Sequence, residues 1–193
     1  MKTAVLLLAA GKSSRMGRVK QLLPIGDKTL LEIAIKSAIQ SKADKTYCVL
    51  GAHFEAIQKS IEDYPVEIIL NTNYHSGLGS SIIAGLKHLE DKHFQSILIM
   101  LADQPEVDAN YLNQLIDESS KQPSKIIASS YSGLSGVPAV FPKQYYNELL
   151  NLKGDKGAKD FLNSSTTEVI QIDSIPLIDI DTTEDYSAYL NSL

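Results

Sequence analysis

Short apolar runs alternate along the chain with longer segments in which apolar residues recur every three or four positions. The apolar runs TAVLLLA, TYCVLG, VEIIL and SILIML occupy residues 3–9, 46–51, 66–70 and 96–101. The segments that follow them, at 29–40, 53–64, 80–91 and 108–120, have helical spacing. Four strand-then-helix units in succession predict an α/β fold, with a mostly parallel sheet covered by helices on both faces. The continuous hydrophobicity of the first and fourth runs indicates strands buried on both sides.

The pattern becomes less regular in the last third of the chain. The runs KIIASSY, PAVFP and EVIQI predict further strands over residues 125–131, 138–142 and 168–172, and residues 143–152 have the spacing of a helix. Glycines and prolines between 133 and 142 indicate an irregular insertion that faces the functional edge of the sheet. We find no internal repeat and no linker in the sequence, so we expect one domain over residues 1–193.

Composition narrows the class of protein. The chain has 193 residues, of which 44% are apolar and 21% charged, as in ordinary globular proteins. A net charge of -5 argues against nucleic-acid binding, which depends on clustered Lys and Arg side chains. The single cysteine, Cys48, has no partner for a disulfide and fits a reducing compartment. The apolar runs are too short for a membrane span, and no signal-peptide pattern appears, so we expect a cytoplasmic protein with no membrane partner.

Residues 8–24, LAAGKSSRMGRVKQLLP, place a one-sided charge directly after the first apolar run. The stretch holds four cationic residues and is followed by no acidic residue until Asp27. Gly11 can approach a ligand closely, and the serines and backbone N–H groups after it can line an anion-binding concavity. The stretch lacks the first glycine of a Walker A loop, and GLGSSI at 77–82 lacks the third glycine of a dinucleotide fingerprint. The sequence therefore predicts a polyphosphate site at the end of the first strand; a merely solvated cationic loop is the alternative.

Several motifs, in one order over most of the chain, resemble the MobA-like nucleotidyltransferases, and most of all their molybdenum cofactor cytidylyltransferase branch. They are LAAG-x-S-x-R-M-G-x-x-K-x-L-L-P, Gly77-x-x-x-Ser81-x-x-x-Gly85, Asp103-Gln104-Pro105, Gly136-x-Pro138, GDKGA at 154–158 and DIDTTED at 179–185. The resemblance implies a Rossmann-like nucleotide-diphospho-sugar transferase fold. It also implies an enzyme that joins a nucleoside monophosphate to a phosphorylated acceptor and releases pyrophosphate.

The same resemblance assigns roles residue by residue. It implies Arg15, Lys20 and Asp103 as catalytic residues, because such transfers depend on positioning and on stabilising negative charge rather than on a covalent nucleophile. Ser80 and Ser81 have a second interpretation, as caps of the helix that follows. The residues implied to bind the nucleotide are Leu8, Ala9, Ala10, Gly11, Arg15, Lys20, Gly77, Ser81 and Asp103.

Carboxylates near two chain segments suggest a magnesium cofactor. Asp103 directly follows the fourth apolar run, and Mg2+ is usually held by one or two carboxylates together with substrate phosphates. A turn-capping aspartate before Pro105 is the alternative. DIDTTED resembles the family's D-x-D-T-P-E-D, which implies Asp181 as the second metal ligand. Asp179 is second to it, since alternating residues of an extended segment share a face, and Asp185 is expected in the first turn of a terminal helix.

Other polar and aromatic residues carry weaker expectations. The four histidines, His53, His75, His88 and His93, show no metal-ligand spacing, and we expect them at the surface or at helix ends. The pair Tyr145–Tyr146 is expected to pack a helix.

The nucleotide and the acceptor are less well specified. By resemblance, alanine at Ala10 is typical of the cytidylyltransferase branch and glycine of the guanylyltransferase branch, which favours CTP. Molybdopterin is the favoured acceptor, with a molybdoenzyme or its chaperone as a candidate partner, although Val137 stands where the branch commonly has histidine.

Three other functions are alternatives to a molybdenum cofactor cytidylyltransferase. A cytidylyltransferase for methylerythritol phosphate or phosphocholine is the nearest, although the D-x-A-R-P segment expected of the former is LADQP here. A non-catalytic nucleotide-binding accessory protein would be expected to have lost the metal carboxylates, and both are present. A metal-dependent glycosyltransferase would carry its metal motif after a middle strand, whereas Asp179-Ile180-Asp181 lies near the end of the chain.

Overall fold

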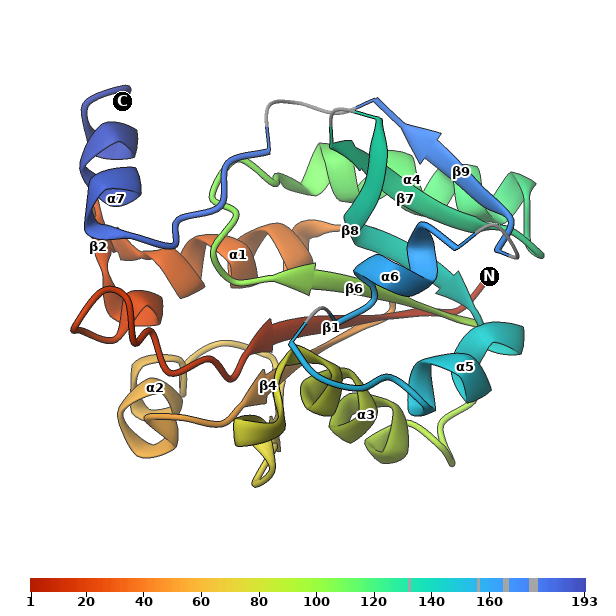
Figure 1. The fold of residues 1–193 in the computed structure, drawn as a ribbon, viewed down its shortest axis with the longest axis horizontal. Helices are drawn as coiled ribbons and strands as arrows, with labels where there is room; N and C mark the ends of the chain where they lie inside the picture. Colours follow the sequence, from red (N-terminus) through yellow and green to blue (C-terminus); the bar gives the residue numbers. More distant parts are fainter. Residues whose placement is uncertain (132, 156, 165–166, 174–176) are drawn as a thin grey trace.

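A seven-stranded sheet forms the centre of the protein (Figure 1). The computed structural model describes residues 1–131, 133–155, 157–164, 167–173 and 177–193. In each neighbouring pair among the first four strands across the sheet the strands are parallel, whereas the fifth runs antiparallel to both of its neighbours. The strands, in order across the sheet, are β5 (Glu67–Leu70), β4 (Lys45–Leu50), β1 (Thr3–Ala9), β6 (Ser96–Leu101), β8 (Leu134–Pro142), β7 (Ile126–Tyr131) and β9 (Val169–Ile172). The predicted mostly parallel α/β fold is confirmed.

Helices cover both faces of this sheet (Figure 1). One face packs against α1 (Leu30–Gln40), α2 (Phe54–Ser60) and α4 (Ala109–Lys121). The other packs against α3 (Leu78–His88), α5 (Tyr146–Leu150) and α6 (Lys159–Leu162). None of the helices in the described ranges combines the length and the apolar content that a membrane crossing requires.

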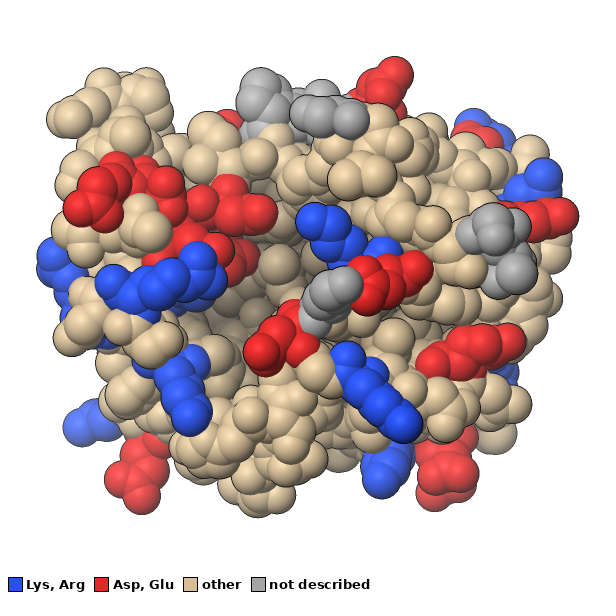
Figure 2. Space-filling model, in the orientation of Figure 1, with Lys and Arg blue, Asp and Glu red and all other residues tan. Residues whose placement is uncertain are grey.

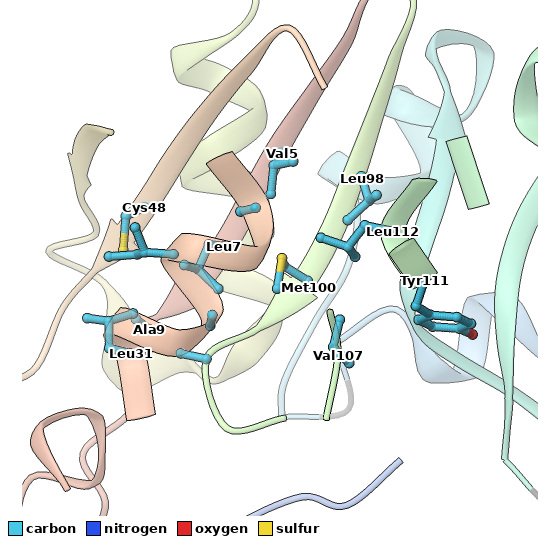
Figure 3. Close-up of a cluster of buried hydrophobic side chains, with 14 of the residues drawn as sticks. Val5, Leu7, Ala9, Leu31, Cys48, Leu98, Met100, Val107, Tyr111 and Leu112 are labelled. Atoms are coloured by element: carbon cyan, nitrogen blue, oxygen red, sulfur yellow. The ribbon is translucent and has the colours of Figure 1, made fainter. Parts of the chain in front are cut away.

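Strand β1 contributes to the core on both of its faces. Val5 and Leu7 point into the cluster under α1 and α4, where Cys48 and Leu98 also lie (Figure 3). Leu6, by contrast, points into the opposite cluster. Because side chains alternate across a strand, only a continuous apolar run satisfies two buried faces at once. This explains why the run carries no polar alternation.

The predicted helices form, with boundaries set by their caps. Thr29 caps α1 in a reciprocal capping box with Glu32, and the Asp108 side chain accepts a hydrogen bond from the N–H of Tyr111 at the start of α4. The terminal helix α7 (Thr183–Leu190) begins with a capping box between Thr182 and Asp185, so Asp185 lies in the first turn as expected. Such caps satisfy N–H groups that the helix itself leaves unpaired.

The interpretation of Ser80 and Ser81 as helix caps is wrong. Helix α3 begins earlier, at Leu78, and its N-cap residue is Gly77, whose backbone lies at φ 90° and ψ 179°. Ser80 instead donates to the carbonyl of Gly77 (2.7 Å), and both serine Oγ atoms accept hydrogen bonds from the side-chain amide of Asn71. Local propensity favoured a serine cap, but only glycine adopts this conformation readily.

The irregular insertion expected over residues 133–142 is also wrong. Leu134–Pro142 forms one long strand, β8, which pairs with both β6 and β7 and shifts register between Ala128 and Ser129 of β7. Position 136 of this strand needs glycine, because a Cβ atom there would lie 2.6 Å from the ring of Tyr131. The glycine is therefore explained by the close approach of an aromatic ring, and it does not indicate a loop.

Residues 143–152 are helical in two short pieces. A 3-10 turn at Lys143–Tyr145 leads into α5, and Tyr145 and Tyr146 pack against the core cluster under α3. The ring of Tyr145 meets that of Phe161 edge-on at 5.9 Å. The predicted packing role of this pair is confirmed.

The strand order places a crevice at the ends of β1 and β6. The chain passes from β1 to β4 and β5 on one side, and then returns to β6 on the other side of β1. In open parallel sheets, ligands bind outside the carboxyl ends of the strands where this reversal occurs. Gly11 and Asp103 each lie two residues after the end of one of these strands, and so at this crevice.

Candidate active site

A cavity of about 480 Å³ opens at the carboxyl ends of β1 and β6. Figure 2 shows a hollow on this face with acidic and basic side chains gathered together along its rim. The glycine-rich loop, the start of α3, the turn after β6 and the segment before α7 all line it. Every residue predicted to touch the nucleotide or the metal is in the lining: Leu8, Ala9, Ala10, Gly11, Arg15, Lys20, Gly77, Ser81, Asp103 and Asp181. Their roles stay predictions, but the fold brings them to one place.

The ammonium group of Lys20 joins the two carboxylates predicted to bind metal. Lys20 Nζ lies 2.5 Å from Asp103 Oδ2 and 2.9 Å from Asp181 Oδ1, and it also donates to the carbonyl of Ile180 at 3.3 Å. Arg15 reaches the other oxygen of Asp181 at 3.2 Å. Three segments far apart in the sequence are therefore tied together by charge at the cavity wall.

These contacts shift the pKa values of Lys20 and Asp181. Burial alone would lower the pKa of Lys20, but the carboxylates of Asp103 and Asp181 outweigh it and raise that pKa. Partial burial opposes ionisation of Asp181, yet Lys20 and Arg15 together hold its pKa below the usual value. Both shifts favour the charged forms of Lys20 and Asp181 at neutral pH.

A buried glutamine holds the glycine-rich loop in its curved path. The Gln21 side chain, only 2% exposed, donates to the carbonyls of Ala9 (3.0 Å) and Gly11 (3.1 Å). Ser13, at φ 55°, uses its Oγ to accept the N–H of Lys20 and to donate to Gln21 Oε1. Sequence reasoning missed Gln21, although an uncharged amide among four cations was a signal that a neutral hydrogen-bonding group was needed there.

The segment before α7 closes the site from the opposite side. The N–H of Ile180 donates to the carbonyl of Asp103 at 2.9 Å, and the Ile180 side chain is fully buried. Tyr186 of α7 donates to the carbonyl of Pro24 at 2.5 Å, which anchors the helix beside the β2–β3 hairpin, Pro24–Ile25 and Lys28–Thr29. These contacts hold Asp181 beside Asp103, although the two residues are far apart in sequence.

The residues of this site fit a divalent cation that shares its coordination with a substrate. Asp103 Oδ1 is buried and has no hydrogen-bond partner among the described residues, so one carboxylate oxygen is available. Within the ranges that the structure describes, no three His, Cys, Asp or Glu side chains form a metal cluster. Two carboxylates suit Mg2+, which commonly takes its remaining ligands from water and phosphate oxygens. Asp103 and Asp181 would hold such an ion.

Comparison with known proteins identifies the family. The family model described as the MobA-like NTP transferase domain matches residues 5–169. This chain belongs to the MobA-like NTP transferases. The membership makes the protein a nucleotidyltransferase, and its Rossmann-like architecture is the nucleotide-diphospho-sugar transferase fold.

Relatives of this MobA-like protein resemble it over nearly their whole length. It is 31% identical over 195 residues to the purine catabolism protein PucB of Bacillus subtilis, covering 93% of this chain and 91% of that protein. It is 32% identical over 176 residues to nicotine blue oxidoreductase of Paenarthrobacter nicotinovorans, covering 86% and 84%. The crystal structure of Rv0371c from Mycobacterium tuberculosis matches with a TM-score of 0.84 at 28% identity, covering both chains fully. Rv0371c has also been solved in complex with manganese.

A second, smaller cavity of about 210 Å³ adjoins the first in this MobA-like protein. The two cavities share the side chains of Leu8, Leu78 and Leu101 as a common wall. Most of the smaller cavity is apolar, and Val137, the residue that departs from the branch pattern, lies in its lining together with Gln104.

Asp179 belongs to the smaller cavity and not to the larger one. Its Oδ1 accepts a hydrogen bond from Gln104 Nε2 at 2.8 Å. Partial burial raises the pKa of Asp179 and the nearby charges of Asp103 and Asp181 raise it further, although the Gln104 hydrogen bond opposes them. Asp179 and Asp181 flank the buried Ile180, and their carboxylates line the two adjoining cavities, Asp179 the smaller one and Asp181 the larger one. This arrangement fits the alternation expected of an extended segment.

The histidines are exposed, and one of them lines the larger cavity. His88 pairs with Glu67 at 2.5 Å, at the end of α3, as expected for a residue at a helix end. His75 also lies at the surface, but it lines the larger cavity beside Tyr74, and the two ring centroids are 4.0 Å apart. Lys12 lies 5.9 Å from the Tyr74 ring centroid. The sequence analysis judged the histidines only by metal-ligand spacing, so it did not place His75 at the site. The feature that could have indicated its position is the adjacent aromatic residue Tyr74.

Gly77 is expected to be required for stability as well as for the shape of the site. Its backbone lies in a region that is essentially accessible only to glycine, and a Cβ atom would lie 2.6 Å from the carbonyl group of Gly154. We expect Gly77→Ala to lower the free energy of unfolding by about 1–3 kcal/mol from backbone strain, with the overlap adding to it. Chemical denaturation of the variant and of the wild type measures this difference.

Gly11 provides the matched control for Gly77. It lines the same cavity, but its φ is not in the left-handed region and a Cβ atom there would meet no heavy atom within 4 Å. Gly11→Ala should leave the free energy of unfolding within about 0.5 kcal/mol of wild type. If both variants lost the same stability, the strain at Gly77 would not be its cause.

Proposed function

We propose that the protein transfers CMP from CTP to molybdopterin, a phosphorylated small molecule, and releases pyrophosphate with Mg2+ as its cofactor. The observation that carries this proposal is the meeting of Arg15, Lys20, Asp103 and Asp181 in one cavity. This arrangement supports a triphosphate site in a nucleotidyltransferase. The family membership supports the reaction class, and the sequence resemblance to the cytidylyltransferase branch supports the choice of nucleotide and acceptor.

The reaction needs charge stabilisation more than it needs a nucleophile in the protein. An oxygen of the acceptor phosphate attacks the α-phosphorus of CTP, the new P–O bond forms, and the bond to pyrophosphate breaks. Lys20 and Arg15 supply positive charge beside the phosphates, where negative charge develops. Gln21 keeps the backbone of the glycine-rich loop in place.

The balance of charges favours a divalent cation in the substrate complex. Lys20 and Arg15 already offset Asp103 and Asp181, so the negative charges of a bound triphosphate would be left without compensation by these four side chains. A Mg2+ ion held by Asp103 and Asp181 would neutralise phosphate charge and orient the leaving group. The manganese complex of the structural relative Rv0371c supports a divalent metal in this proposal.

The proposal is tested with four nucleoside triphosphates against molybdopterin, with pyrophosphate release as the readout. We expect turnover with CTP and Mg2+. Turnover with CTP and methylerythritol phosphate or phosphocholine, but not with molybdopterin, would replace the proposed acceptor. Binding of nucleotide without turnover on any of these acceptors would favour the accessory-protein alternative. The relatives PucB and nicotine blue oxidoreductase do not name an acceptor, so this panel decides it.

Ala10 is expected to contribute to the choice of CTP over GTP. Ala10 is 6% exposed, lies in the wall of the larger cavity, and accepts the N–H of Ala52 through its carbonyl at 3.1 Å. Its methyl group takes space beside the base site that a purine would need, so we expect Ala10→Gly to lower the CTP-to-GTP ratio of kcat/KM. One methyl group gives about 10- to 200-fold discrimination at most. A wild type that prefers GTP, or an unchanged ratio in the variant, would show that this steric explanation is wrong.

A further inference from the structure

The smaller cavity has the size and the walls of a binding site for a compact ring. Its volume is about 210 Å³, and an apolar cavity of about 150 Å³ is enough to bind benzene. Leu78, Ile82, Ile99 and Leu162 contribute apolar side chains to its lining. It adjoins the larger cavity, since Leu8, Leu78 and Leu101 line both, and the larger cavity holds Lys20 and Arg15.

Polar groups interrupt these apolar surroundings at Ser135, at the exposed Lys159, and on one wall that is built around Gln104. The side chain of Gln104, 1% exposed, donates through Nε2 to Asp179 Oδ1, to the carbonyl of Val137 at 3.3 Å and to the hydroxyl of Tyr131. Two of these partners, a carbonyl and a carboxylate, can only accept, so the orientation of the Gln104 amide is fixed. The other amide atom, Gln104 Oε1, is buried without a hydrogen-bond partner among the described residues.

Asp179 is the charged group that this wall presents to a ligand. Gln104 holds its Oδ1, whereas its Oδ2 accepts no hydrogen bond from a described residue. A carboxylate with a free oxygen beside apolar walls favours a ligand that offers N–H donors, and it disfavours a phosphate. Lys159 also lines the smaller cavity, but Arg15 and Lys20 line the larger one together, so the anionic end of an acceptor is assigned to the larger cavity and its hydrogen-bond donors to the side of Asp179.

We propose that Asp179 is a specificity residue for the acceptor, recognising adjacent N–H and amino donors on the edge of a flat heterocycle in the smaller cavity. This inference rests on the proposed function for the position of the acceptor phosphate. Beyond the proposed function, the inference states that the heterocyclic end of the acceptor enters the smaller cavity and that the protein recognises its N–H and amino groups there. Oδ2 of Asp179 is free, and Oδ1 keeps a second lone pair beside its hydrogen bond from Gln104, so the carboxylate can still accept a planar pair of donors. The hydrogen bond from Gln104 fixes the direction in which the Asp179 carboxylate faces the ligand.

Two fluorescent probes without a phosphate test this assignment directly. Pterin is a fused heterocycle whose amino group adjoins a ring N–H, and lumazine has a carbonyl oxygen in place of that amino group. Fluorescence titration of the wild-type protein should show pterin binding roughly 10- to 100-fold more tightly than lumazine, the range expected for hydrogen bonds to a charged group. Asp179→Asn should lose most of this preference, and should keep wild-type binding of CTP in the same buffer.

Glu184→Gln is the matched control. Glu184 is an exposed carboxylate of the same terminal segment and lines neither cavity, so its variant removes the same charge without touching the wall. It should keep the preference for pterin. Equal binding of the two probes by wild type, or an unchanged preference in Asp179→Asn, would overturn the inference. The titration needs no turnover, so a failed transfer to molybdopterin alongside a retained pterin preference would count against the proposed function alone.

Discussion

Asp103→Asn is expected to reduce metal-dependent turnover by about 1,000-fold or more, while the protein stays folded. Removing the charge of Asp103 weakens the cation site at the point where phosphate charge must be neutralised, and losses of this order follow the removal of one preorganised electrostatic group. Asparagine still offers an oxygen to Lys20, whose ammonium lies 2.5 Å from the Asp103 carboxylate, so stability should fall much less. Pyrophosphate release at several Mg2+ concentrations, together with thermal unfolding, separates the two effects.

A capping aspartate on α4 serves as the comparison for Asp103. The Oδ1 of Asp108 accepts the N–H of Tyr111 at 2.8 Å and lies in neither cavity. Asp108→Asn should cost at most about 1 kcal/mol of stability and leave turnover unchanged. Asp181→Asn should behave like Asp103→Asn. Near-normal turnover in either cavity variant would remove that residue from the metal site and leave it as a turn residue.

Lys20→Ala is expected to lower turnover by about 100-fold or more. The ammonium group both supplies charge to the triphosphate and separates two carboxylates, so its loss removes a stabilising charge and leaves Asp103 and Asp181 without their shared partner. Breaking a largely buried pair by deleting one member destabilises by up to about 3–5 kcal/mol. We also expect Mn2+ to bind the nucleotide-free variant more tightly than the wild type, because a divalent cation can replace the missing ammonium.

The other two cations of the glycine-rich loop are the controls for Lys20. Lys12 and Arg18 contact aromatic rings, 5.9 Å from the centroids of Tyr74 and Tyr186 respectively, and neither forms an ion pair with a carboxylate among the described residues. Their alanine variants should lose far less turnover than Lys20→Ala. Equal losses in all three, with a strong dependence on salt, would indicate diffuse electrostatic attraction in place of a built phosphate site.

The position of the glycine-rich loop could be predicted from the sequence, but the ion pairs of its cations could not. Its cations and its position after a buried strand predicted a polyphosphate site, and the structure places that loop at the reversal of strand order. The carboxylates that hold Lys20 and Arg15 were named as metal ligands, but their ion pairs with these cations could not be predicted. The pairs join residues that are distant in the sequence, and hydropathy patterns carry no information about such contacts.

The segment before α7 shows what the alternation of side chains could not specify. Alternation predicted that Asp179 and Asp181 share a face, as they would in a regular strand. The segment is not a strand among the described residues, and its path is set by the burial of Ile180 and by the hydrogen bond from its N–H to Asp103. The two carboxylates line adjoining cavities, Asp181 the larger one and Asp179 the apolar one, and alternation does not predict that division.

The sequence by itself determined the alternation of strands and helices, the burial of β1 on both faces, and the gathering of cations in the glycine-rich loop after β1. These follow from hydrophobic periodicity, from caps and from residue types, all of which act within a few neighbouring positions. Only the tertiary structure decided that the strand expected over 138–142 begins at Leu134, that Gln21 and Gln104 form hydrogen bonds in the walls of the two cavities, and that Asp179 and Asp181 line different cavities. Those outcomes depend on side chains from distant segments meeting at the end of the sheet, where packing and hydrogen bonding outweigh local preference.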